Sequence, residues 1–232
     1  MKRFYKEAGS APAEGGHGVL LDGKPVRTPA RALLVTPSAA LAQAVADEWQ
    51  VQGEKIDPAS MPLMRMVATA IDRIPANRSA VEADLMAFAS ADLLCYRATH
   101  PTALVERQSG LWQPVLDWAA LRLDAALLVT QELVQIEQPP QALAALQRRL
   151  EALDALELVA VHTITAATAS LLLALAVVEG ELDARAAFEA GQADELYGLE
   201  VWGEDEQARA RLDTLSGEIA AAERLLMLAR QP

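Results

Sequence analysis

Cysteine and aromatic residues are scarce in this sequence of 232 residues, which contains one cysteine and has an aromatic fraction of 4%. The single thiol, Cys95, excludes an intramolecular disulfide framework and a zinc site built from several thiolates. A lone cysteine is also typical of a protein from a reducing compartment. Because aromatic residues are few and alanine is abundant, the composition favours helices over a β-sandwich.

Positive charge is also scarce, since the sequence has 20 lysines and arginines but 32 acidic residues, and the formal net charge is -12. Nucleic acids and anionic membrane surfaces attract proteins through a positive surface, so neither is expected as a partner. The deficit is local, because residues 131–232 contain eighteen acidic residues and seven arginines. This acidic part is either a solvated surface or a face for a basic partner.

One long apolar run interrupts the polar sequence, namely the 21 residues 158–178, which carry no formal charge. That length is enough to cross a bilayer. Its flanks are acidic, however, and lack the cationic residues and aromatic anchors of a membrane-spanning helix. We therefore predict a buried central helix of a bundle, with His162 in the core, and no stable membrane insertion. The N-terminus lacks the apolar stretch of a secretory signal.

The beginning of the chain predicts a small domain of mixed structure. Asp22-Gly23 between apolar residues favours a β-hairpin. The glycine-rich segment 9–18 is predicted to be a loop. A helix is expected next, with Thr36 as its N-cap and an apolar face that ends in Trp49.

Helical periodicity dominates the rest of the chain. Apolar residues recur at spacings of three and four residues, and Ser79 with Glu82 has the pattern of a capping box at a helix start. We therefore predict an α+β protein in two parts. Residues 1–57 form a small mixed β/α domain, and residues 58–232 form a larger α-helical bundle domain.

Motifs for catalysis or metal binding are missing from the sequence. His17, His100 and His162 lie far apart, so no pair has the spacing of zinc ligands on one helical face. The glycine-rich segment 15–18 is not followed by the lysine and hydroxyl residue of a phosphate-binding loop. Cys95 lies in an apolar segment, where burial raises the pKa of a thiol and makes it unreactive. The sequence therefore predicts no catalytic residue, cofactor or metal, and favours a protein that acts by binding another protein.

Four groups of sequence blocks form a recognisable pattern through their order and spacing. They are residues 21–29 with 35–38 and 46–49; residues 92–97; residues 104–108 with 112–118; and residues 195–197 with 200–203. Together they resemble the family of F(1)-ATPase assembly chaperones that bind the alpha subunit of ATP synthase. The resemblance covers nearly the whole chain, and no single block is diagnostic.

This resemblance implies a small N-terminal β-containing domain followed by an orthogonal helical bundle, in agreement with the division drawn from the residues. It also implies a non-enzymatic role that needs no ATP. The chaperone would hold the unassembled alpha subunit, covering a surface that later contacts the beta subunit, until beta replaces it. Because organelle members have a presequence that this chain lacks, a bacterial cytoplasm is expected, whereas the eukaryotic relatives are mitochondrial.

The resemblance also points to candidate residues for client binding. The family's important acidic residue comes shortly after a Trp-Gly pair, which here begins at Trp202. Glu206 is the best positional match, with Asp205 and Glu204 as alternatives, and we expect these residues to bind the client. Trp49 is expected either in the core at the domain junction or in contact with the client. The alternative function is a small-molecule enzyme with a carboxylate-lined site between the two domains.

Overall fold

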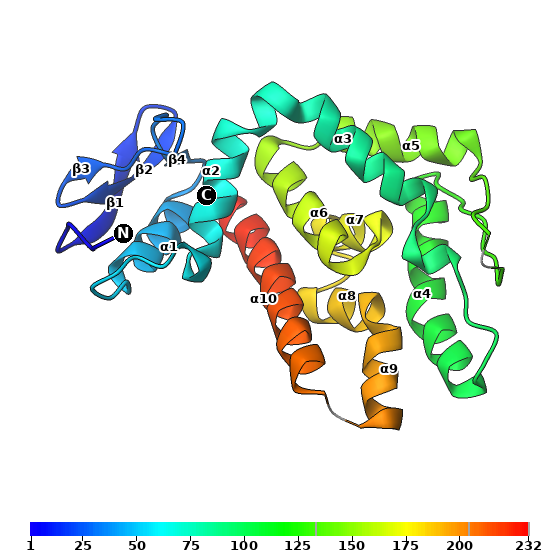
Figure 1. The fold of residues 1–232 in the computed structure, drawn as a ribbon. Helices are drawn as coiled ribbons and strands as arrows, with labels where there is room; N and C mark the ends of the chain where they lie inside the picture. Colours follow the sequence, from blue (N-terminus) through cyan, green and yellow to red (C-terminus); the bar gives the residue numbers. More distant parts are fainter. Residues whose placement is uncertain (133, 204, 232) are drawn as a thin grey trace. The chain divides into compact units, whose positions relative to one another are not determined.

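The computed structural model describes residues 1–132, 134–203 and 205–231. Over these residues the chain forms four short strands and ten α-helices (Figure 1), which confirms the predicted α+β class. The chain divides into two compact units. Unit 1 comprises Met1–Arg78, Asp154–Ala160 and Ala221–Pro232, and unit 2 comprises Ser79–Leu153 and Val161–Ala220. The division into domains at residues 57 and 58 stays a prediction, which limited proteolysis would test.

Unit 1 begins with an antiparallel sheet of four strands. β1 (Ala8–Ala13) pairs with β2 (Gly16–Leu21), and β2 also pairs with β3 (Lys24–Pro25) and β4 (Val35–Thr36). The predicted hairpin at Asp22-Gly23 is confirmed, because these two residues join the paired strands β2 and β3.

The prediction of a loop over residues 9–18 is wrong. This segment forms most of β1, a tight turn and the start of β2. Gly16 has a φ of +148°, and a Cβ atom there would lie 2.2 Å from the carbonyl oxygen of Thr36. Glycine at this position therefore lets β2 approach β4 closely, in a backbone conformation that other residues rarely adopt. The glycines of this segment therefore lie in the two strands and in the tight turn that joins them.

α1 (Ala39–Gln50) packs on this sheet and buries the apolar face that the sequence predicted. Its N-cap is Ser38 and not Thr36. The Ser38 hydroxyl accepts a hydrogen bond from the backbone N–H of Leu41 at 3.0 Å, whereas Thr36 belongs to β4. Ser38 satisfies one of the N–H groups that a helix start leaves without a partner.

A buried carboxylate joins α1 to α2 (Pro62–Asp72), which follows the short 3-10 helix η1 (Pro58–Ser60). Glu48 of α1 is 8% exposed, and its two oxygens accept hydrogen bonds from the N–H groups of Leu63 and Met64, both at 2.8 Å. Burial raises the pKa of the Glu48 carboxyl, and these two hydrogen bonds oppose that change. Glu48 is therefore the cap of a helix other than its own.

Unit 2 consists mainly of helices. The remaining elements along the chain are α3 (Ile74–Ser90), η2 (Leu93–Cys95), α4 (Thr102–Arg122), α5 (Pro140–Glu151), α6 (Ala155–Thr168), α7 (Leu171–Glu179), α8 (Ala184–Gly191), α9 (Ala193–Trp202) and α10 (Glu206–Ala229). α3 is bent at Asn77, whose φ of -128° and ψ of 15° are non-helical. The capping box predicted at Ser79 and Glu82 therefore lies inside α3, just after the bend.

The apolar run over residues 158–178 is not the single helix that was predicted. α6 ends at Thr168, Ala169 has a positive φ of 55°, and Ser170 caps α7 by accepting a hydrogen bond from the Leu173 N–H at 3.1 Å. α7 is buried at every position before its last residue, whereas His162 on α6 is exposed and not in the core. Within the described residues, no helix is both long enough and apolar enough to span a membrane.

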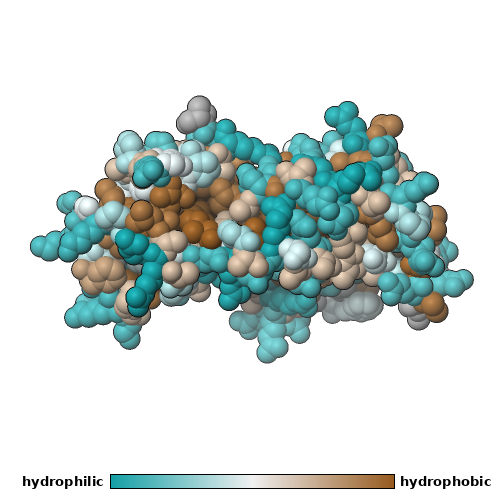
Figure 2. Space-filling model, turned by 90° about the horizontal axis from the view of Figure 1, so that it is seen from above, coloured by the Kyte–Doolittle hydropathy of each residue, from teal (hydrophilic) through white to brown (hydrophobic). Residues whose placement is uncertain are grey.

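Several large apolar side chains remain exposed on the surface. They include Leu33 and Val51 in unit 1, and Leu121 and Trp202 in unit 2. Figure 2 shows one face of the molecule, on which hydrophilic residues surround an area of apolar ones. Scattered apolar residues are normal on protein surfaces, so a candidate site needs a cavity or polar groups beside them.

Candidate functional site

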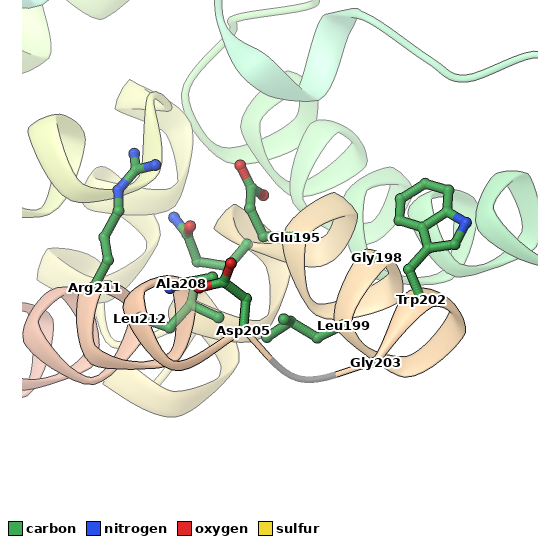
Figure 3. Close-up of a pocket in the computed structure, with 10 residues that line it drawn as sticks. Glu195, Gly198, Leu199, Trp202, Gly203, Asp205, Ala208, Arg211 and Leu212 are labelled. Carbon is green, nitrogen blue, oxygen red and sulfur yellow. Dashed lines mark hydrogen bonds between the residues drawn. The ribbon is translucent and has the colours of Figure 1, made fainter.

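A pocket of about 270 Å³ lies in unit 2 between α9 and the first turns of α10 (Figure 3). Its apolar walls include Leu199 and Trp202 from α9, and Ala208 and Leu212 from α10. The pocket depends on residues of both helices, which lie thirteen positions apart between Leu199 and Leu212. It is the candidate functional site.

Charged side chains surround this pocket. Glu195, Asp205 and Arg211 line it, and in Figure 3 Glu195 and Arg211 extend toward the same side of the view as the ring of Trp202. The side chain of Glu195 has no hydrogen bond or ion pair with any described residue. The rim therefore offers one unpaired carboxylate and one cation beside an apolar cavity.

Asp205 has a structural task in addition to its place on the rim. Its Oδ1 accepts hydrogen bonds from the N–H groups of Gln207 at 2.8 Å and Ala208 at 2.9 Å. This is the geometry of a helix N-cap, and a carboxylate there also complements the positive end of the helix dipole. Glu206 is the first residue of α10 and is exposed, but it does not line the pocket.

Trp202 is 83% exposed although its indole is large and apolar. The ring lies against Gly198, one turn earlier in α9, where an added Cβ would be 3.2 Å from a ring atom. Gly198 thus leaves room for the indole to lie across the helix surface. Tryptophan is enriched among residues that dominate protein–protein binding, so this exposure indicates an interaction surface.

Polar contacts with α4 hold α9 in place. Arg107 donates two hydrogen bonds to Glu200, at 3.0 Å and 2.5 Å, and its guanidinium carbon lies 5.5 Å from the centre of the Tyr197 ring. Gln108 donates to Asp194 at 2.7 Å. The hydrogen bond with Arg107 lowers the pKa of Glu200. The carboxylates of Glu200 and Asp194 are therefore engaged within the fold, unlike that of Glu195.

A second pocket of about 170 Å³ shares Gln192, Glu195 and Arg211 with the first. Trp112 of α4 lines it, and its indole N–H donates a hydrogen bond to the Ala190 carbonyl at 2.8 Å. Gln192 donates to the carbonyl of Ala167 at 2.8 Å. These contacts anchor the ends of α8 and α9, so the sequence block around Trp112 supports the site without being exposed in it.

Two ionisable side chains in the core of unit 2 have pKa values that are shifted from their usual ones. Burial raises the pKa of the Asp92 carboxyl to about 6, against the hydrogen bonds that it accepts. Burial, and then the charge of Asp92, raise the pKa of the Cys95 thiol to about 12. The predicted burial of Cys95 is confirmed, whereas its lack of reactivity stays a prediction. Among the described residues, no group of three or more histidine, cysteine, aspartate and glutamate side chains is placed to hold a metal ion.

The structure places the predicted site residues in four different situations. Trp202 and Asp205 line the same pocket, Glu206 lies beside it, and Glu204 lies outside the described residues. Trp49 belongs to unit 1 and is 9% exposed.

Trp49 packs edge to face against Tyr5, with ring centres 5.6 Å apart. The Tyr5 hydroxyl donates a hydrogen bond to the Trp49 carbonyl at 2.5 Å. Within the part of the chain that the structure describes, the indole nitrogen of Trp49 has no hydrogen-bond partner.

Sequence reasoning missed Glu195, Arg211 and Gln192 as site residues. Glu195 and Gln192 had a weak signal, since one belongs to a sequence block of the resemblance and the other precedes it. Arg211 had none, because an arginine on a polar helix face is usual.

These features are typical of a class of protein: an α+β protein whose helices present an exposed apolar and charged surface suited to binding another protein. The family model of the ATP12 chaperone protein matches residues 2–120. The chain belongs to the ATP12 chaperone family, which acts in ATP synthase assembly, and it is therefore an assembly chaperone, as the sequence blocks predicted.

Solved structures agree over nearly the full length. Atp12 from Paracoccus denitrificans is 40% identical with a TM-score of 0.92, and the match covers 99% of this chain and 98% of that one. A mutant of the same Atp12p is 39% identical with the same TM-score and coverage. The Atu1473 protein of Agrobacterium tumefaciens is 45% identical with a TM-score of 0.92, over 97% of this chain and 85% of that one.

Proposed function

We propose that this chaperone binds the unassembled alpha subunit of F(1) ATP synthase and holds it until the beta subunit replaces it. The observation that supports this function most is the exposed indole of Trp202 beside a carboxylate-rimmed apolar pocket, in a chain of the ATP12 family. Such a surface suits a protein client and has no obvious use in a monomeric protein that binds nothing.

The physical need for such a protein follows from ring assembly. A ring subunit without its neighbour exposes an apolar interface, which promotes aggregation. Binding lowers the concentration of the free subunit by mass action, so no ATP is required. Release requires an affinity below that of the beta contact. An apolar anchor with charges around it meets this need, because charges contribute more to specificity and association rate than to affinity.

Size-exclusion chromatography of purified components tests this function. We expect the chaperone to co-elute with free alpha subunit as a stoichiometric complex, and not with assembled F(1). Beta added to the complex should release the chaperone. Co-elution with the assembled F(1) but not with isolated alpha would contradict the proposal.

Charge reversal after Trp202 tests which acid contacts the client. Glu206→Lys should weaken capture of alpha and leave the fold intact, since Glu206 is exposed and does not cap the helix. Asp205→Lys should also lower stability, by about 1 kcal/mol for a lost N-cap. The defect of Glu206→Lys should grow at low ionic strength, where screening is weakest. If these two variants and Glu204→Lys all capture alpha equally well, the acidic residues after Trp202 only cap the helix and do not contact the client.

The bacterial cytoplasm is the proposed location, and the three similar solved structures described above come from bacteria. The alternative of a small-molecule enzyme stays a prediction with a simple test. A metabolite that remains bound through purification of the chaperone would favour it.

A further inference from the structure

We propose that the pocket between α9 and α10 receives one large apolar side chain of the alpha subunit, and that an arginine or lysine lies next to this side chain in the client. The inference rests on the proposed function, because it takes the alpha subunit as the client. It goes beyond that function because it specifies the kind of client segment that the pocket binds and the side chains that contact this segment.

The volume and walls of the pocket select an apolar occupant. About 270 Å³ is the volume of roughly nine liquid waters. Leu199, Ala208 and Leu212 present carbon atoms to the cavity, so a water molecule there would lack hydrogen-bond partners on these walls. An apolar side chain that displaces poorly held water gains affinity, whereas a polar one would lose its own hydrogen bonds.

Trp202 extends the apolar wall beyond the pocket. Trp202 is 83% exposed, and its ring lies over Gly198, so the ring is already positioned before a client arrives. A rigid aromatic side chain needs little ordering on binding, and its burial removes a large apolar area from water. An occupant of the pocket would cover one face of this indole.

The charges around the pocket select a basic neighbour for the apolar side chain. Among the described residues that line it, Glu195 and Asp205 are acidic and Arg211 is the one cation. Asp205 is engaged as the cap of α10, which leaves Glu195 as the carboxylate without a partner in the fold. An arginine or lysine of the client would form an ion pair with Glu195. Arg211 would repel a cation of the client that lies next to it.

Filling the pocket tests this proposal. Ala208→Phe places a ring in the cavity, and Ala210→Phe places the same ring on an exposed position of α10 that does not line it. We expect Ala208→Phe to weaken binding of purified alpha subunit by about tenfold or more, as for loss of one anchor residue. Ala210→Phe should bind like the natural protein. Thermal melts of both variants show whether each is folded.

A second pair of variants changes exposed side chains, so it disturbs packing less than a ring placed in the cavity. Trp202→Ala removes the exposed indole, and Val201→Ala is its control, because Val201 is 54% exposed and does not line the pocket. Trp202→Ala should weaken capture and Val201→Ala should not. Glu195→Lys should weaken it more than Glu195→Gln, with the larger difference at low salt.

A photoreactive benzophenone side chain at position 202 identifies the occupant. We expect a crosslink to an alpha-subunit peptide in which a large apolar residue lies within two positions of arginine or lysine. A crosslinked peptide without a basic residue would overturn the charge part of the proposal.

The outcomes separate this proposal from the proposed function. If folded Ala208→Phe and Trp202→Ala both capture alpha normally while Glu206→Lys does not, the pocket proposal is wrong and the function stands. If these variants instead abolish self-association of the chaperone and leave capture unchanged, the occupant is a second copy of this chain. If the natural protein binds no alpha at all, the proposed function itself fails.

Discussion

Replacing Asp92 by alanine tests whether one buried carboxylate joins two helical segments of unit 2. Asp92 is 0% exposed. Its Oδ1 accepts hydrogen bonds from the Ser170 hydroxyl at 2.8 Å and the Leu94 N–H at 3.1 Å, and its Oδ2 accepts one from the Leu172 N–H at 3.1 Å. The side chain thus caps η2 and the first turn of α7 together. Alanine would leave these three donors without their acceptor.

The expected magnitude follows from those donors. A buried donor without an acceptor costs about 1–3 kcal/mol, and part of that loss is offset because a buried charge is removed as well. We therefore expect Asp92→Ala to lower the free energy of unfolding by about 3–5 kcal/mol. For a chain of this size, that lowers the melting temperature by roughly 6–20 °C. Asp84→Ala, an exposed aspartate on α3, should change stability by less than about 0.5 kcal/mol.

The pH dependence supplies a second, independent result. Because burial raises the pKa of Asp92 from its usual 3.8 to about 6, the folded state binds this proton more tightly than the unfolded state. The contribution to stability is therefore fully present below pH 3.8 and is lost as the pH rises through about 6. Two pKa units at about 1.36 kcal/mol each give a loss on the order of 3 kcal/mol. Asp92→Asn cannot titrate and should lack this dependence.

Urea unfolding of the natural protein, Asp92→Asn and Asp92→Ala between pH 4 and 8 measures both effects. Subtracting the asparagine curve removes the titration of all other carboxyls. A difference that stays constant over this range would refute the linkage argument. An alanine variant within about 1 kcal/mol of the natural protein would refute the capping argument.

Two further predictions concern the aromatic core of unit 1 and the support of α9. Trp49→Ala should lower the free energy of unfolding by about 3–5 kcal/mol, since the ring is buried against Tyr5; an unchanged melt with lost alpha capture would instead make Trp49 a client contact. Arg107→Glu should raise hydrogen exchange in α9 and weaken capture, because the pair with Glu200 is replaced by repulsion. Adding Glu200→Arg should restore both, and a double variant as weak as Arg107→Glu would show that the pair does not position the helix.

Local turn chemistry and helical periodicity predicted part of the fold. Asp22-Gly23 specifies a hairpin through its own backbone preferences, and the face ending in Trp49 repeats every four residues. The strand over Ala8–Ala13 could not be predicted in this way. Its alanine, glycine, serine and proline have low β-propensity, and pairing with β2 outweighs that preference.

The apolar run over residues 158–178 shows the same limit in the helical part. Its apolar composition suggested one helix, but Ala169 adopts a positive φ and Ser170 starts a new helix. The hydroxyl of Ser170 both caps α7 and donates to Asp92, which lies far away in sequence. Ser170 is the one local signal of this break within the run, and its partner Asp92 lies outside the run.

Sequence reasoning named two residues of the candidate site, Trp202 and Asp205, but it did not predict the shape of the site. In an uninterrupted helix, Leu199 and Leu212 would be separated by thirteen residues and about 20 Å. They line one pocket because the chain turns between α9 and α10, where Gly203 has a φ of +97° that glycine adopts readily and Asp205 caps the next helix. The Trp-Gly pair and the acid that follows therefore have one structural explanation. Trp202 ends the first helix, Gly203 turns the chain and Asp205 begins the second, so that an apolar cavity opens beside an exposed indole.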